Sequence, residues 1–216
     1  MTRSRTFLLE FALVGALLPV TVEAQLVAMD TASLAVGPYA EANMLLEKTI
    51  FRVDVAELRI RFGVETASGL ETLLNGASRS DALEDSVALF AAQTRDAWAG
   101  LTFQRDVGFD RFIGGVRDGV KVAREEKYID PEFARNLSDS MPNWYAPLRT
   151  RGVRKGDVMM YRIQGDTLRT VFRTVDGQVL VDQVGVGFQA RLSVMGGFFG
   201  HGSDFRKGLL SFLLQF

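Results

Sequence analysis

The stretch that decides the fold reads FQRDVGFDRFIGGVRDG and runs from Phe103 to Gly119. Its first residues are typical of a strand, which we expect to end at Val107. A helix is expected next, because apolar residues then recur every three or four positions. Those residues are Phe109, Phe112, Ile113, Val116 and Val120. The stretch therefore predicts a strand that leads directly into an amphipathic helix.

Strand patterns on both sides of this stretch predict one antiparallel sheet. Upstream, residues 45–62 are rich in branched and aromatic side chains and predict one bent strand or two strands, with a bulge near Ala56 and Glu57. Downstream, residues 157–163, 167–173 and 179–184 form three strand-like runs. The turns Gly165-Asp166 and Asp176-Gly177 separate these runs and predict a meander that pairs in sequence order.

Helix signals fill the intervals between the strands. A helix over 66–74 is expected to end at Asn75 and Gly76, and a second runs from Asp81, its expected cap, to about Gln93. The second helix is expected to place Leu83, Val87, Phe90 and Ala91 on one face. A third helix starts at Asp130-Pro131 and is expected to stop at Pro142.

Two further helical segments are expected near 188–194 and 204–214, the latter capped by Ser203 or Asp204. The glycine-rich run GGFFGHGSD reads as the connection between them, because it lacks the lysine of a phosphate-binding loop. Together the patterns predict an α+β fold, an open-faced sandwich whose antiparallel sheet carries helices on one face.

Composition limits the function classes. Across 216 residues, 25 basic and 26 acidic residues give a net charge of −1 without any charge block, so nucleic acid is not expected as a partner. There is no cysteine, which excludes disulfides and thiolate catalysis, and the single histidine, His201, excludes a multi-histidine metal site. No metal or cofactor is therefore expected.

The first 24 residues have the order of a signal peptide. Arg3 and Arg5 precede a mostly apolar run, and Val22-Glu23-Ala24 fits a small-x-small cleavage site. We expect cleavage after Ala24, an arm over residues 25–43, and a folded domain over 44–216. The expected location is the periplasm or the exterior, with no stable membrane insertion after cleavage. An uncleaved anchor is the alternative.

The junction at 103–119, together with GVRKGDVMMYRIQGDTLRTVF and GSDFRKGLL, resembles the chalcone isomerase family over most of the chain after Asn43. The resemblance implies a bacterial chalcone isomerase-like protein. In the plant isomerases the pocket helix carries a tyrosine, a lysine and an asparagine. Phe112, Gly115 and Gly119 occupy those positions here, and none can donate a proton or a hydrogen bond from its side chain. No catalytic residue is therefore assigned.

The resemblance also implies a pocket between the sheet and this helix, where related proteins hold a flat phenolic compound or a fatty acid. By periodicity alone the apolar stripe of the helix fills a core, and only the resemblance favours a cavity. Asp54 lies in an apolar strand and is expected to pair with an arginine or to contact a ligand. The candidate ligand-binding residues are Asp54, Phe109, Phe112, Gly115, Val116 and Tyr161.

The leading hypothesis is a non-catalytic, exported protein that binds a small apolar or amphipathic ligand such as a fatty acid. One alternative is an isomerase or lyase that uses other polar residues. A second alternative is an interaction protein with a packed core and no ligand. A cavity would separate the first two from the third, and converging polar groups inside it would indicate chemistry.

Overall fold

The computed structural model describes residues 41–47 and 54–214, with side chains from residue 56 onward. Six strands form one antiparallel sheet in the order β1-β2-β3-β4-β5-β6, so every strand pairs with its neighbours in the chain. The strands are β1 (Glu41–Glu47), β2 (Asp54–Phe62), β3 (Asp96–Phe103), β4 (Val158–Gln164), β5 (Thr167–Arg173) and β6 (Val179–Val186). The predicted meander and sheet are confirmed.

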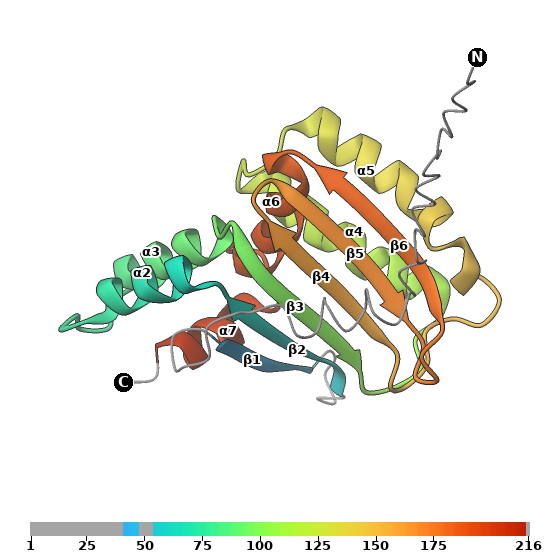
Figure 1. Ribbon diagram of the computed structural model, residues 1–216, viewed down its shortest axis with the longest axis horizontal. Helices are drawn as coiled ribbons and strands as arrows, with labels where there is room; N and C mark the ends of the chain where they lie inside the picture. Colours follow the sequence, from blue (N-terminus) through green and yellow to red (C-terminus); the bar gives the residue numbers. More distant parts are fainter. Residues whose placement is uncertain (1–40, 48–53, 215–216) are drawn as a thin grey trace, which may run out of the picture.

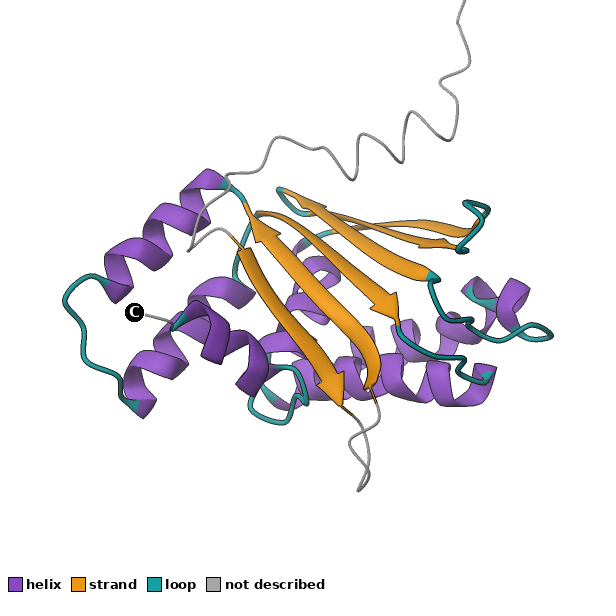
Figure 2. Ribbon diagram, turned by 90° about the horizontal axis from the view of Figure 1, so that it is seen from below, coloured by secondary structure: helices purple, strands orange, loops and turns teal. Residues whose placement is uncertain are grey.

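The helices cover one face of this sheet, as the view in Figure 2 shows. In Figure 1, α4 and α6 lie behind the central strands, α2 and α3 form a hairpin at one end, and α7 lies beside β1. The helical elements are α2 (Val64–Leu74), α3 (Asp81–Ala92), α4 (Phe109–Glu125), α5 (Pro131–Trp144), the 3-10 turn η1 (Ala146–Leu148), α6 (Phe188–Phe199) and α7 (Arg206–Leu213). The predicted open-faced sandwich is therefore the observed architecture.

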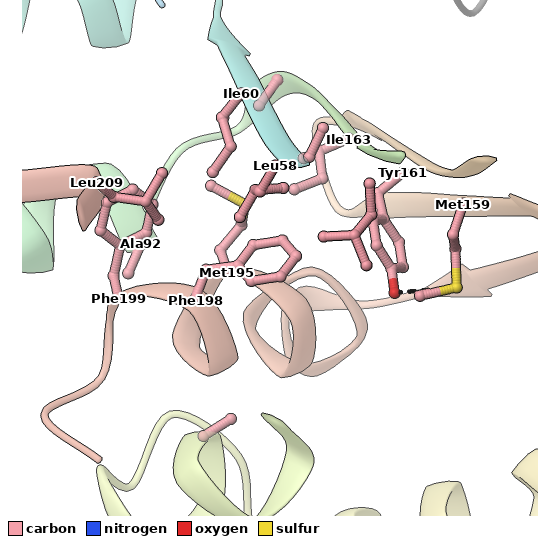
Figure 3. Packing of buried hydrophobic residues seen from close by; sticks show 14 of the residues in the cluster. Leu58, Ile60, Ala92, Met159, Tyr161, Ile163, Met195, Phe198, Phe199 and Leu209 are labelled. Carbon is pink, nitrogen blue, oxygen red and sulfur yellow. Dashed lines mark hydrogen bonds between the residues drawn. The ribbon is translucent and has the colours of Figure 1, made fainter. Parts of the chain in front are cut away.

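The core fills the space between the sheet and the helices. Alternate residues of each strand point into it, because successive strand side chains face opposite sides of a sheet. On β2 these are Ala56, Leu58, Ile60 and Phe62, all buried, as expected from the alternation. Met195 and Phe199 of α6 lie against this layer and are fully buried (Figure 3).

Turn chemistry follows the sequence. Gly165 and Gly177 adopt φ of +60° and +92°, in the left-handed region that glycine enters without steric cost, and they close the β4–β5 and β5–β6 turns. Gly76 ends α2 in the same way, with φ of +69°. Asp130 caps α5 by accepting a hydrogen bond from the Phe133 N–H at 2.7 Å, as predicted.

Several boundaries differ from the predictions. The strand before α4 ends at Phe103, and Val107 instead forms an isolated bridge with Val153. Among the described residues, β1 starts at Glu41, within the expected arm, and the division into arm and domain stays a prediction. By contrast, two strands over 45–62 was one of the predicted alternatives and is confirmed, with a register shift that skips Val55, next to the predicted bulge.

Two helix caps and one helix face also differ. Ser80, rather than Asp81, caps α3, because its hydroxyl accepts from the Leu83 N–H at 3.2 Å. Ser203 accepts from the Phe205 N–H ahead of α7, which itself has no side-chain cap. Phe90 is exposed, so the buried face of α3 lacks it.

Pro142 does not stop α5, which continues to Trp144. A proline has no N–H to donate, so the carbonyl of Ser138, four residues earlier, loses its helical partner. The guanidinium of Arg117 in α4 replaces that donor, with Nε at 3.1 Å and Nη2 at 3.0 Å from the Ser138 oxygen. This contact from a neighbouring helix allows a proline where the sequence predicts an end.

Candidate functional site

A cavity of about 510 Å³ lies between the sheet and the helices, bordered by α4. Its inner wall comes from β2, β3, β4 and β5, and its outer wall from α4, the C-terminal half of α5, α6 and the α6–α7 connection. Most lining side chains are apolar, among them Ala56, Leu101, Phe103, Val116, Leu137, Met141, Leu168 and Phe198. The space suits an apolar molecule.

Two tyrosines bring polar atoms to this apolar wall. Tyr161 belongs to β4, and Tyr145 directly follows α5. The hydroxyl of each donates to the sulfur of Met159, at 3.4 Å in both cases. Figure 3 shows the Tyr161 hydroxyl turned toward Met159. Two phenol groups therefore share one thioether, which is a weak acceptor.

Both tyrosines are almost wholly buried, with 3% of Tyr145 and 6% of Tyr161 exposed. Burial raises the pKa of the Tyr145 phenol. Burial, and secondly the neighbouring Tyr145, raise the pKa of Tyr161 well above its ordinary value. Both groups are consequently neutral hydrogen-bond donors at physiological pH.

Among the side chains described from residue 56 onward, charged groups reach the cavity only at its exposed border. The charged side chains that line it are Arg111 and Asp118 of α4 and Asp204 of the α6–α7 connection, and all three are exposed. Thr170 and Ser193 add hydroxyls to the wall, and Ser193 donates to the Ala190 carbonyl at 2.7 Å. As far as the described side chains form it, the interior of the cavity is therefore apolar except for neutral donors.

Four of the six predicted site residues lie in the cavity wall: Phe112, Gly115, Val116 and Tyr161. Phe112 is buried and presents its ring to Tyr145 in an edge contact, with the ring centroids 5.0 Å apart. Phe109 lies outside the wall, and the Arg149 guanidinium stands 5.9 Å from its ring centroid. Whether the four wall residues bind a ligand stays a prediction.

Asp54 begins β2, where its backbone pairs with Glu47, and its side chain lies outside the described structure. The alternation that buries Ala56 cannot be extended to Asp54, because the register shift at Val55 intervenes. The predicted ligand contact of Asp54 therefore stays a prediction.

Sequence reasoning missed Tyr145 and Met159. The sequence predicts a helix end at Pro142, whereas α5 continues to Trp144 and places Tyr145, its C-cap residue, in the cavity wall. Met159 belongs to a strand that was predicted correctly, and its alternation with Tyr161 places both on the same face. Because Tyr161 is a predicted site residue, this alternation indicates that Met159 lies on the same face of the strand.

The glycines of α4 have different roles. A Cβ at Gly114 or Gly115 would meet no atom within 4 Å, and both residues border the cavity. Gly119 instead lies against Gly197 of α6, where the two backbones approach closely. The expected connection GGFFGHGSD therefore begins inside α6, and its first glycines serve helix packing.

His201 lies in an exposed polar cluster. Its Nδ1 is 3.0 Å from Glu126 Oε1, and its Nε2 is 3.0 Å from Asp85 Oδ1, which also accepts from Arg206. In residues 41–47 and 54–214, no three His, Cys, Asp or Glu side chains are grouped to hold a metal ion. None of the helices in those ranges combines the length and apolar character that crossing a membrane requires.

Comparison with known proteins places the fold. No family model matches the chain, and no curated protein matches it. Among solved structures, a fatty-acid binding protein of Arabidopsis thaliana is similar, with a TM-score of 0.51 over 85% of this chain and 94% of the plant protein. The two sequences are 9% identical, so the similarity extends to the fold alone. The chain has the chalcone isomerase-like fold.

Proposed function

We propose that the protein binds a small apolar or amphipathic ligand, such as a fatty acid, in the cavity bordered by α4. The observation that carries this proposal is the cavity itself. The space measures about 510 Å³ and opens to solvent at its border, where Arg111, Gly115 and Asp118 are exposed. Ligand pockets typically measure about 300–1,000 Å³ and are lined mostly by apolar side chains, as this one is.

The similar plant structure supports the same class of ligand, because it is a fatty-acid binding protein that shares the fold. Fold alone does not fix a function, so the argument depends on the site. An isomerase or lyase would need an acid and a base at the reacting atoms. Among the described residues that line the cavity, the carboxylates Asp118 and Asp204 are exposed, which favours binding over chemistry.

Titration with cis-parinaric acid tests the proposal, because this C18 fatty acid becomes strongly fluorescent in an apolar site. Saturable binding with one ligand per protein is expected. The variant Gly115→Leu adds a side chain at the cavity border, where a Cβ meets no neighbour, and should weaken binding by about tenfold, equivalent to about 1.4 kcal/mol.

Gly115→Ala is the matched control, because it gains the same helix propensity with little bulk. Both variants should melt at or above the temperature of the parent. A parent protein without saturable binding, combined with a Gly115→Leu variant that loses stability, would contradict the proposal and favour the packed interaction protein.

We also propose that binding takes place outside the cytoplasm, after cleavage following Ala24. Support for export comes from the order of basic, apolar and small residues over 1–24, which lie outside the described ranges. Native mass spectrometry of the protein recovered from its source cells would identify a ligand that copurifies.

A further inference from the structure

We infer that Tyr145 and Tyr161 together receive one uncharged acceptor oxygen, a carbonyl, of an otherwise apolar ligand. The inference rests on the proposed function and specifies its ligand class: esters, ketones or protonated acids in preference to carboxylates. Tyr145, Tyr161 and Met159 all line the cavity, and the two hydroxyls donate to the same Met159 sulfur.

The two phenol hydroxyls make only weak hydrogen bonds, because their shared acceptor is a thioether sulfur. Buried hydroxyls in proteins nearly always have an oxygen or nitrogen partner, since burial without one costs free energy. Here both donors instead share a single thioether sulfur, at 3.4 Å each. An oxygen from a ligand is a better acceptor than this sulfur and would be preferred by both hydroxyls.

Neighbouring rings hold the two tyrosines in place. Tyr145 makes an edge contact with Phe112 at 5.0 Å between centroids, and Tyr161 makes one with Phe198 at 6.0 Å. Both donors are therefore positioned before a ligand arrives, which reduces the ordering cost of binding.

The charges around the cavity argue for a neutral acceptor. The titratable groups in the described wall are the two tyrosines, Arg111 and Asp118 from α4, and Asp204 from the α6–α7 connection. β2, β3, β5, α5 and α6 contribute apolar, threonine, serine or glycine residues there, and tryptophan at Trp144. An ionised carboxylate beside the tyrosines would be buried without a cation, whereas an ester or ketone carbonyl pays no such penalty.

Paired titrations with cis-parinaric acid and its methyl ester test the inference between pH 5 and pH 9. The ester should bind with constant affinity over this range. The acid should bind as its protonated form, so its affinity should fall by about tenfold for each pH unit above its own pKa. At pH 8 the ester should therefore bind more tightly than the acid.

Variants then locate the acceptor oxygen. Tyr145→Phe and Tyr161→Phe each remove only a hydroxyl and should weaken ester binding by about five- to tenfold, as expected for one hydrogen bond. Met159→Leu removes the competing sulfur at nearly equal volume. It should increase ester affinity while lowering the melting temperature of the unliganded protein, since both phenols lose their acceptor.

The outcomes separate the two proposals. If neither probe binds the parent protein, the proposed function fails, and the inference fails with it. If both bind but the acid is preferred at pH 8 and Arg111→Gln removes that preference, the head group lies at the border of the cavity. That result would overturn the inference and leave the proposed function intact. Should a Phe variant not fold, the acid-to-ester comparison on the parent and on Met159→Leu still decides.

Discussion

Gly197 of α6 lies against Gly119 of α4 so closely that a Cβ on Gly197 would come within 2.9 Å of the Gly119 carbonyl oxygen. Backbone that meets backbone cannot move aside as a flexible side chain can. The absence of side chains at these two positions therefore sets the spacing of the two helices that border the cavity.

The first prediction concerns this contact. Gly197→Ala should lower the free energy of unfolding by about 1–3 kcal/mol, because the added methyl group overpacks the helix interface. Urea denaturation measures the loss. Gly114→Ala is the control in the neighbouring helix, where a Cβ has free space, and it should raise stability by up to about 1 kcal/mol. Equal effects of the two variants would show that the contact is not tight.

The second prediction concerns Pro142 and Arg117. Arg117→Ala should cost about 1 kcal/mol, because the Ser138 carbonyl loses its donor. In a Pro142→Ala background the new N–H can donate to that carbonyl, so the same arginine substitution should cost less. A double-mutant cycle by chemical denaturation measures the difference. Additive effects would contradict the account.

The third prediction concerns Asp157, which is fully buried. Its carboxylate accepts two hydrogen bonds from Arg151, at 2.7 Å and 3.2 Å, and one each from the N–H groups of Arg154 and Val175. Asp157→Ala should cost about 3–5 kcal/mol, because it leaves a partly buried guanidinium and two N–H groups without partners.

Asp106→Ala is the control for Asp157, since Asp106 also pairs with an arginine and a backbone N–H but is exposed to solvent. The loss of stability in Asp106→Ala should be much smaller, because water screens the ion pair between Asp106 and Arg154. Comparable unfolding midpoints for the two variants would show that burial does not determine the effect.

The fourth prediction concerns pH. Hydrogen bonds from the Phe133 N–H, and secondly from the Gln189 side chain, hold the pKa of Asp130 below its ordinary value. The stabilisation that Asp130 gives is therefore fully present above the unfolded pKa of about 3.9 and is lost as the pH falls through the lower folded pKa. Asp130→Asn keeps a capping oxygen but does not titrate, so its urea midpoint should fall less steeply below pH 4. Identical profiles would contradict this.

The fifth prediction concerns the mature chain. N-terminal sequencing of exported protein should begin at Gln25, because cleavage is expected after Ala24. The parent protein should be cleaved. The matched variant Ala24→Arg should accumulate with its N-terminus intact, because the cleavage pattern needs a small residue at position 24. An intact N-terminus on parent protein in the membrane fraction would support the uncleaved anchor.

Local chemistry made the sheet and several helix starts predictable. The meander carries its register in the sequence, because two turns with glycine separate runs of strand-forming residues, and both Gly165 and Gly177 adopt the positive φ that those turns require. Asp130 followed by Pro131 likewise specifies a helix start through neighbouring residues alone. The predictions at these positions succeeded because their determinants lie within a few residues.

Contacts between distant residues explain the errors at Pro142 and Gly197. Pro142 predicts a helix end unless a donor reaches Ser138, and that donor, Arg117, comes from another helix. A helix that ends at Pro142 would not place Tyr145, whereas the helix that continues to Trp144 brings Tyr145 to the cavity wall. The sequence predicts a loop at Gly197. The residue that it packs against, Gly119, is 78 positions earlier in the chain, so no local pattern indicates the contact.

The Arg117 contact also bears on how fast a ligand could exchange. α4 and α5 both border the cavity, and the guanidinium bonds of Arg117 join them at the middle of each helix. Any opening that separates these two helices must break both hydrogen bonds from Arg117 and leave the Ser138 carbonyl without a donor. Along that route the association and dissociation rates slow together, so residence time is lengthened without any change in affinity.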